Sequence, residues 1–370
     1  MAEVVRTPTL IPELEPVQLL APDGRRLPSD DWDVDLSDDD LVGMYVDMAV
    51  ARALDQEFIH LQRQGHLALY ASCRGQEGAQ VGSAAALHED DWIFPQYREL
   101  GVFVHRRMDV PGMSEFWRGS WHSGHDCLAS RCAPLCIPIA THTLHGVGYA
   151  MGVALDGAHS AVVVYLGDGA TSEGDTHEAM NFASVFGAPC VFFLQNNQWA
   201  ISVPVSEQSH APSLAHRGVA YGIPAVRCDG NDVLASYAVS KWALERARRG
   251  EGPSLIEAVT YRMEAHTTSD DPTRYRSAAE VEHWRQLDPI DRLVAHLRLA
   301  GTWSAEVEQR ATSLAAEQCA ELRRLTIEAP ETDPAEVFEH VYADPPAEFR
   351  REAAEYTEWQ RGGLAGEGAP

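Results

Sequence analysis

Two apolar segments that each end in polar residues constrain the fold of this chain most. A predicted strand at 160–166 ends in the sequence Gly-Asp-Gly, and a second at 190–195 ends in Asn-Asn. A helix is expected between them. Because the carboxyl ends of parallel strands meet at one edge of a sheet, Asp168 and Asn197 are expected to face the same crevice.

The alternation of strand and helix continues beyond this unit. The helix between the two strands is expected to begin at Asp175, since Asp175 and Glu178 resemble a capping box. Apolar strands that alternate with helices are typical of a parallel sheet covered by helices on both faces, so the expected fold class is α/β. The later elements are a strand at 224–228, a helix at 232–249 and a strand at 255–261.

The segments that flank this region differ from it in composition and periodicity. The first 36 residues contain five prolines and indicate either an extended arm that lies on the folded body or a disordered tail. A helix is expected from the N-cap residue Ser37 to about Gln64. Amphipathic patterns predict two tail helices, at 304–326 and 346–361. We therefore expect three parts: an arm at 1–36, an α/β domain at 37–300 and a helical extension at 301–370.

Charge and cysteine usage exclude several classes of partner and of protein. The 370-residue chain has a net charge of −26, which argues against nucleic acid or an anionic membrane as the main partner. The seven cysteines do not form the framework of a secreted disulfide-rich protein. No signal peptide, transit peptide or membrane-spanning segment is recognisable, so a cytoplasmic location is expected.

The residues at the two strand ends have the chemistry of a magnesium site. Mg²⁺ prefers oxygen ligands and usually keeps substrate phosphate in its shell. Asp168 offers a carboxylate, Asn197 offers an amide oxygen, and the flanking glycines allow backbone N–H groups to approach phosphate. A Gly-Asp-Gly turn alone would be weak, but its pairing with Asn-Asn predicts Mg²⁺ bound to a diphosphate.

Six segments carry a more specific resemblance. The chain resembles, over about 37–350, the α subunits of thiamine-diphosphate-dependent 2-oxo acid dehydrogenase complexes. Within that family it is most similar to the branched-chain group, because of its Ser-Glu-Gly-Asp, Ala-Ile-Ser and His-Thr-Thr-Ser-Asp-Asp sequences. The resemblance implies a thiamine-diphosphate-binding fold. The segments are GQEGAQVGSAAAL at 75–87, FPQYRELG at 94–101, GDGATSEGDTHEAMNFA at 167–183, NNQWAIS at 196–202, DGNDV at 229–233 and YRMEAHTTSDDPTRYRS at 261–277.

The resemblance implies a set of cofactor contacts. Asp168, Asn197 and the carbonyl of Trp199 would bind Mg²⁺, and His266 would be the catalytic residue placed over the cofactor. Imidazole titrates near neutral pH and can donate to diphosphate or to substrate. The remaining cofactor-binding residues would be Tyr97 and Arg98 at the diphosphate, Ile139 at the aminopyrimidine ring, Gly169 and Ala170 through their backbone, and Gln96.

The polar loop that follows His266 is expected to be ordered by its own side chains. Related enzymes that are regulated carry phosphoserine sites in this loop, where this chain has Thr267 and Ser277. Because a hydroxyl group alone does not establish a kinase, no such regulation is predicted. The residues expected to order the loop are Asp270, Asp271, Arg274, Tyr275 and Arg276.

The chain departs from the family pattern in two places. Residues 119–136 lack a Gly-Lys-Gly…Met-His stretch that relatives often carry, and His122 or His125 could replace its histidine. Gln195 stands where branched-chain relatives can have an arginine directed to the diphosphate. Three cysteines close to these histidines allow a zinc site as an alternative, although their spacing favours incidental thiols. These cysteines are Cys127, Cys132 and Cys136.

The resemblance implies that this chain supplies half of an active site. The glutamate that activates the aminopyrimidine ring would lie on a β subunit, so an α₂β₂ assembly and inactivity of the isolated chain are expected. The glycine-rich segment at 146–152 is a candidate contact, although tight internal packing would explain its glycines equally well. Other expected partners are a small 2-oxo acid and a lipoyl-bearing acyltransferase.

Three alternatives to a branched-chain 2-oxo acid dehydrogenase remain open at the level of the sequence. The same kind of subunit could act on pyruvate or acetoin. A Mg²⁺-dependent phosphohydrolase could also use Asp168, but it would not explain the paired asparagines. A degenerate, non-catalytic scaffold would explain Gln195 and the missing Gly-Lys-Gly segment.

Overall fold

The computed structural model describes residues 10–120, 123–330, 335–339 and 341–363. Its centre is a five-stranded sheet in which every neighbouring pair is parallel. This confirms the predicted parallel sheet and adds one short strand, β1, that the sequence analysis did not predict. The strand order is β1 (Trp92–Phe94), β2 (Val162–Gly167), β3 (Cys190–Asn196), β7 (Ser254–Val259) and β6 (Ala225–Asp229).

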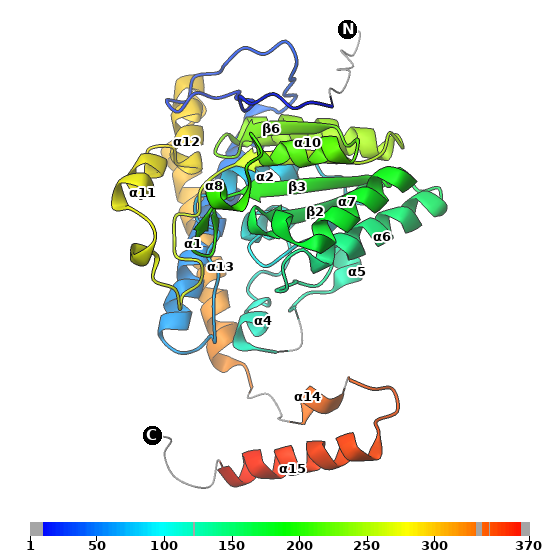
Figure 1. Ribbon diagram of the computed structural model, residues 1–370. Helices are drawn as coiled ribbons and strands as arrows, with labels where there is room; N and C mark the ends of the chain where they lie inside the picture. The colour runs from blue at the N-terminus through cyan, green and yellow to red at the C-terminus, as the bar shows by residue number, and fades with distance from the viewer. Residues whose placement is uncertain (1–9, 121–122, 331–334, 340, 364–370) are drawn as a thin grey trace.

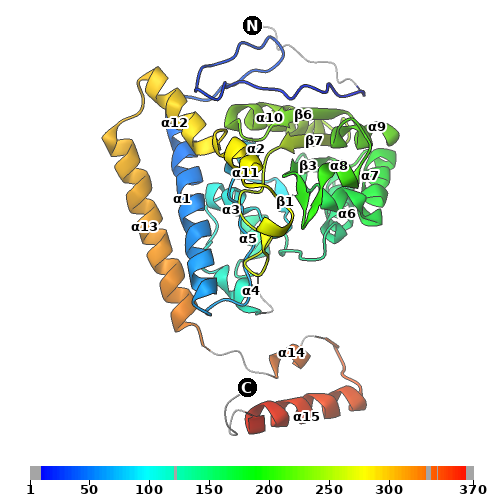
Figure 2. The same ribbon diagram turned by 60° about the vertical axis from the view of Figure 1, so that its left-hand side comes forward.

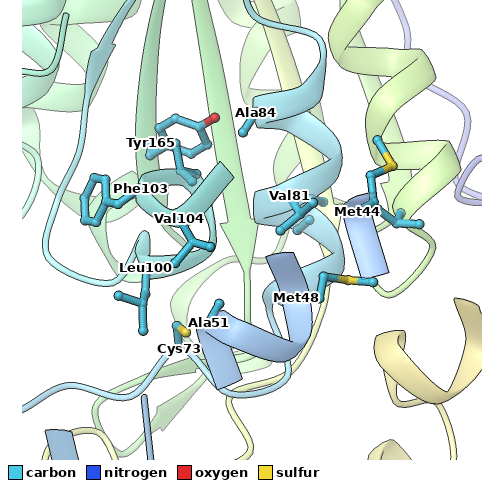
Figure 3. Close-up of a cluster of buried hydrophobic side chains, with 14 of the residues drawn as sticks. Met44, Met48, Ala51, Cys73, Val81, Ala84, Leu100, Phe103, Val104 and Tyr165 are labelled. Carbon is cyan, nitrogen blue, oxygen red and sulfur yellow. The ribbon is translucent and has the colours of Figure 1, made fainter. Parts of the chain in front are cut away.

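Helices cover both faces of this sheet, as predicted (Figure 1). Successive side chains of a strand point to opposite faces. In β2, Tyr165 therefore packs with α1, α2 and α3, whereas Val164 packs against α6 and α7. Figure 3 shows part of the hydrophobic core on the Tyr165 side of the sheet, where Met44 and Met48 of α1 approach Val81 of α2.

The helices and the second, two-stranded sheet have the following bounds. The helices before β3 are α1 (Asp38–Arg63), α2 (Glu77–Ala85), α3 (Leu100–His105), α4 (Ser114–Arg118), α5 (Cys127–Ser130), α6 (Thr141–Leu155) and α7 (Gly174–Phe186). The later helices are α8 (Val205–Gln208), α9 (Arg217–Ala220), α10 (Val233–Arg248), α11 (Ala278–Arg285), α12 (Pro289–Ala300), α13 (Ala305–Glu328), α14 (Glu336–Glu339) and α15 (Ala347–Gly363). The small sheet pairs β4 (Trp199–Ala200) with β5 (Val203–Pro204), and three 3₁₀ turns are η1 (Gly169–Ser172), η2 (Leu214–His216) and η3 (Pro272–Arg274).

The long helix α1 begins where the sequence predicted it. The Ser37 side chain accepts from the Asp40 N–H, and the Asp40 carboxylate accepts from the Ser37 N–H, which completes a capping box. Helix α13 lies along α1 (Figure 2) and contributes Ala311 and Leu322 to the same core. Among the described residues, no helix combines the length and the apolar character needed to cross a membrane.

The described part of the N-terminal arm lies on the sheet. Val17 pairs in parallel with Cys228 of the edge strand β6, and the N–H groups of Leu19 and Leu20 both donate to the Asp232 carboxylate, at 2.6 Å each. Leu19 and Leu20 are buried. Hydrogen bonds thus hold the arm against the edge strand β6, which would otherwise be exposed.

The predicted capping box at the start of α7 is wrong. The helix begins at Gly174, its N-cap is Glu173, and no side chain caps it. The chain already turns at η1, directly after Asp168, and only the extended Glu173 separates this turn from α7. Asp175 therefore lies inside the first turn of the helix, where its charge still favours the positive end of the helix dipole.

The glycines of α6 serve two different environments. A Cβ atom built on Gly146 would lie 2.4 Å from the Cγ2 atom of Val164, so Gly146 allows α6 to pack closely on β2. A Cβ atom on Gly148 or Gly152 would meet nothing within 4 Å. Internal packing therefore explains only the first of these three glycines.

Candidate functional site

A cavity of about 470 Å³ lies at the carboxyl edge of the sheet, beyond the ends of β2 and β3. Parallel sheets commonly bind ligands at this edge. The structure brings every cofactor-site residue predicted from the sequence to this one cavity. These residues are Gln96, Tyr97, Arg98, Ile139, Asp168, Gly169, Ala170, Asn197, Trp199 and His266.

Asp168 follows β2 directly and is almost fully buried. Burial raises the pKa of its carboxyl group, because the charged form loses contact with water. The Nε2 atom of Gln208 donates to the Asp168 Oδ2 atom at 2.6 Å and opposes that effect. A carboxylate buried in this way would be stabilised by a bound cation.

The two asparagines at the end of β3 have separate tasks. The Asn196 side chain accepts from the Gln198 N–H and holds that residue in the left-handed region, at φ 75°. This conformation turns the chain sharply between Asn197 and Trp199. Asn197 directs its Nδ2 atom to the Gln76 Oε1 atom at 3.3 Å, and its own Oδ1 atom accepts from the Trp199 N–H at 3.4 Å.

The donor set around Asp168 fits Mg²⁺ and a diphosphate. Asp168, Asn197 and the Trp199 carbonyl offer oxygen atoms, which are the ligands that Mg²⁺ prefers. The Trp199 carbonyl also accepts from Arg262 at 3.1 Å, and its second lone pair leaves room for another partner. The buried Gln76 Nε2 atom lines the cavity and has no hydrogen-bond partner among the described residues, and a phosphate oxygen would satisfy it.

His266 lies between two guanidinium groups. Its Nδ1 atom is 3.3 Å from Arg98 Nη2 and 3.5 Å from Arg262 Nη1. Burial, followed by the charges of Arg98 and Arg262, lowers the pKa of His266 to about 3. Burial and these two positive charges therefore disfavour the protonated imidazole that a free histidine would form near neutral pH.

The loop after His266 is held by its own polar side chains. Asp270 accepts from the His266 N–H at 2.8 Å and from the Tyr275 hydroxyl group. Arg276 donates to the backbone carbonyls of Arg262 and Met263. Asp271 caps the 3₁₀ turn η3 by accepting from the Thr273 N–H at 3.1 Å. These contacts agree with the ordering role expected of Asp270, Asp271, Tyr275 and Arg276.

Gln195 is directed into a buried network. Its Nε2 atom donates to Glu99 at 2.9 Å, and its Oε1 atom accepts from Gln80 at 2.9 Å. Burial raises the pKa of Glu99 to about 7. Both ends of the Gln195 amide are engaged in this network, so Gln195 does not replace the positive charge that an arginine would bring. The guanidinium groups that lie next to His266 are those of Arg98 and Arg262.

His125, one of the two histidines expected to replace the missing loop histidine, does not line this cavity. His122 lies outside the described residues. The His125 ring contacts the carbonyl of Cys132 at 3.2 Å and lines a separate cavity of about 660 Å³ between α4 and the end of α13. The Cys127 Sγ atom is 3.7 Å from the His125 Nε2 atom, whereas the Cys136 thiol donates a hydrogen bond to the carbonyl of Pro138.

These contacts do not assemble a zinc site. Within residues 10–120, 123–330, 335–339 and 341–363, no group of three His, Cys, Asp or Glu side chains could hold a metal ion. All seven cysteines are free thiols, and burial raises the pKa of the Cys132 thiol well above its usual value. The thiolate that zinc requires is thus disfavoured at Cys132.

Gln76, Arg262 and Gln208 are among the residues that the sequence analysis did not assign to the site but that contact its predicted members. Gln76 and Arg262 lie within segments that carry the family resemblance, so their positions could have been proposed from sequence. Gln208 lies on α8 outside those segments, and no spacing pattern indicates it.

Comparisons with known proteins agree with the geometry. The family model described as "Dehydrogenase E1 component" matches residues 45–335. The 3-methyl-2-oxobutanoate dehydrogenase subunit alpha of Mycobacterium tuberculosis is 54% identical over 332 residues, which cover 90% of this chain and 90% of that protein. The pyruvate dehydrogenase E1 component subunit alpha of Bacillus cereus is 39% identical over 88% of each chain. The human mitochondrial 2-oxoisovalerate dehydrogenase subunit alpha is 37% identical over 86% of this chain and 74% of that protein.

Proposed function

Because the chain belongs to the dehydrogenase E1 component family, we propose that it is the α subunit of a branched-chain 2-oxo acid dehydrogenase. The observation that carries this proposal is the convergence of all ten predicted site residues on one cavity. The 54% identity to a 3-methyl-2-oxobutanoate dehydrogenase subunit alpha supports the branched-chain substrate class. The cytoplasmic location and the three-part domain division expected from the sequence remain predictions.

The proposed cofactor is thiamine diphosphate with Mg²⁺. Asp168, Asn197 and the Trp199 carbonyl would bind the cation, and Arg98 with the free N–H of Gln76 would face the diphosphate. When bound, the cofactor supplies the nucleophilic carbon and the electron sink for decarboxylation of a 2-oxo acid. The chain's own contribution is to orient the diphosphate and to compensate its charge.

His266 is proposed to act as a neutral hydrogen-bond donor. Guanidinium nitrogens carry only hydrogen-bond donors, so the Nδ1 atom that faces Arg98 must be the acceptor. The proton of the neutral ring then resides on Nε2. His266 would therefore offer an N–H group to the substrate or the diphosphate without adding a positive charge.

The proposed partners are a β subunit, in an α₂β₂ assembly, and a lipoyl-bearing acyltransferase. A face of α6 and α7 supports the first of these, because several of its large apolar side chains are exposed. The side chains of Leu155, Val185 and Phe186 are 86%, 72% and 57% exposed. Monomeric proteins rarely leave such groups of apolar side chains in water, and subunit contacts commonly cover them.

The substrate class can be tested by decarboxylation assays on the α–β complex. We expect a higher kcat/KM for 3-methyl-2-oxobutanoate than for pyruvate or acetoin. Acyl transfer to a lipoylated acyltransferase domain should follow only with thiamine diphosphate and Mg²⁺ present. Preference for pyruvate would instead favour the function named for the Bacillus cereus relative, and complete inactivity with bound cofactor would favour the non-catalytic scaffold.

A further inference from the structure

We propose that Gln208 is a positioning residue for the divalent cation: its N–H group orients Asp168, and its carbonyl oxygen accepts from a cation-bound water. The inference rests on the proposed function, because it takes Asp168 as a ligand of that cation. Gln208 is the last residue of α8, the helix that follows the β4–β5 hairpin, and its side chain contacts Asp168.

Two contacts fix the orientation of the Gln208 amide. Its Nε2 atom lies 2.6 Å from the Asp168 Oδ2 atom and 3.0 Å from the Val203 carbonyl oxygen. Both partners can only accept when Asp168 is ionised, so the nitrogen must face them. The reversed amide would place its oxygen against two other oxygens. The carbonyl oxygen of Gln208 therefore cannot share these partners.

That oxygen is buried and lacks a partner among the described residues. The Oε1 atom of Gln208 is shielded from solvent, yet no donor in the described part of the chain reaches it. Buried acceptors in folded proteins are nearly always satisfied, by protein groups or by ordered water. Mg²⁺ in proteins usually keeps several waters in its shell, and each of them is a strong donor.

The same amide also limits how Asp168 can bind a cation. Because the N–H group of Gln208 already donates to one lone pair of Oδ2, Oδ1 is the Asp168 oxygen that would bind the metal most readily. Single-oxygen carboxylate ligands suit the octahedral shell that Mg²⁺ demands, whereas Ca²⁺ often takes both oxygens. Gln208 would thereby orient both the Asp168 carboxylate and a water bound to the cation. Outer-shell residues commonly tune metal affinity in this way.

The test is calorimetric titration of Mg²⁺ and thiamine diphosphate into the α–β complex. Gln208→Leu and Gln208→Met remove the donor and the acceptor while they keep the size of the side chain. Glu207→Leu places the same apolar group at the exposed neighbouring position of α8 and serves as the matched control. We expect the Kd for the cation to rise about tenfold to a hundredfold in both Gln208 variants, with unchanged stoichiometry, and not to change in the control.

A purely structural effect would give a different pattern. Misfolding of a variant would lower the number of sites and kcat, whereas the positioning role raises Kd and lets saturating Mg²⁺ restore kcat. Mn²⁺ can replace Mg²⁺ as an electron paramagnetic resonance probe, whose spectrum should change in the Gln208 variants only. An unchanged Kd in both variants, with tight binding to the unmodified complex, would overturn this inference alone. Absence of binding to the unmodified complex would overturn the proposed function and this inference with it.

Discussion

At the scale of single residues, position decides the charge of His266. A histidine in a polar loop is ordinarily free to take up a proton near pH 6.5, but here burial, Arg98 and Arg262 all oppose the proton. The backbone N–H of His266 is held by Asp270, and the ring is partly buried. The ring is thus expected to stay neutral across the physiological range.

The lowered pKa of His266 has a consequence for stability. The unfolded chain gains a proton on His266 as the pH falls below about 6.5, whereas the folded chain does so only near pH 3. The contribution to stability is therefore complete above pH 6.5 and is lost as the pH falls. We predict that the free energy of unfolding of the wild-type protein falls, relative to that of His266→Gln, between pH 7 and pH 5.

The expected difference is on the order of 1–2 kcal/mol. Urea denaturation of the cofactor-free proteins at both pH values would measure it. Parallel pH dependence of the two proteins would contradict the neutral state assigned to His266. Nitrogen chemical shifts of the ring would report the expected Nε2–H tautomer independently.

At the scale of elements, α6 distinguishes two uses of glycine. Gly146→Ala should destabilise the protein by about 1–3 kcal/mol, because the new methyl group would meet Val164 in a packed core. Gly148→Ala should be neutral or stabilise by up to about 1 kcal/mol, because it meets open space and improves helix propensity. Denaturation of the isolated α chain would measure both, and equal effects would contradict this division.

The sequence predicted whole elements better than it predicted their ends. Buried strands such as β2 and β3 are visible as continuous apolar runs, and their order along the chain implies the parallel sheet. The short strand β1 has only three residues, too few for a periodic pattern. The start of α7 was missed because a 3₁₀ turn precedes it, and such a turn has no signature that a capping motif would reveal.

The site was predictable to the extent that its residues fall at strand ends. Asp168 and Asn197 follow β2 and β3, so their proximity follows from the topology alone. Gln208 reaches the site across a small hairpin, and its contact with Asp168 depends on the left-handed conformations of Gln198 and Ile201. Sequence spacing carries no signal for such backbone conformations in residues that rarely adopt them.

At the scale of the whole molecule, the exposed face of α6 and α7 should hold the β subunit. We predict that Val185→Asp weakens α–β association by about tenfold or more, because a charge would be buried in an apolar contact. Leu299→Asp, on α12, changes a side chain that is 64% exposed and should leave association unchanged. Light scattering of mixed α and β chains would measure assembly, and equal effects of the two variants would contradict this placement.

The central claim is that this chain provides the cation and diphosphate half of an active site shared with a β subunit. The most direct measurement is calorimetric titration of thiamine diphosphate and Mg²⁺ into the α chain alone, into the α–β complex, and into the complex carrying Asp168→Asn. We expect tight binding to the complex, weak binding to the isolated chain, and an affinity at least about a hundredfold lower in the variant. Binding that survives Asp168→Asn unchanged, or no binding to the intact complex, would contradict it.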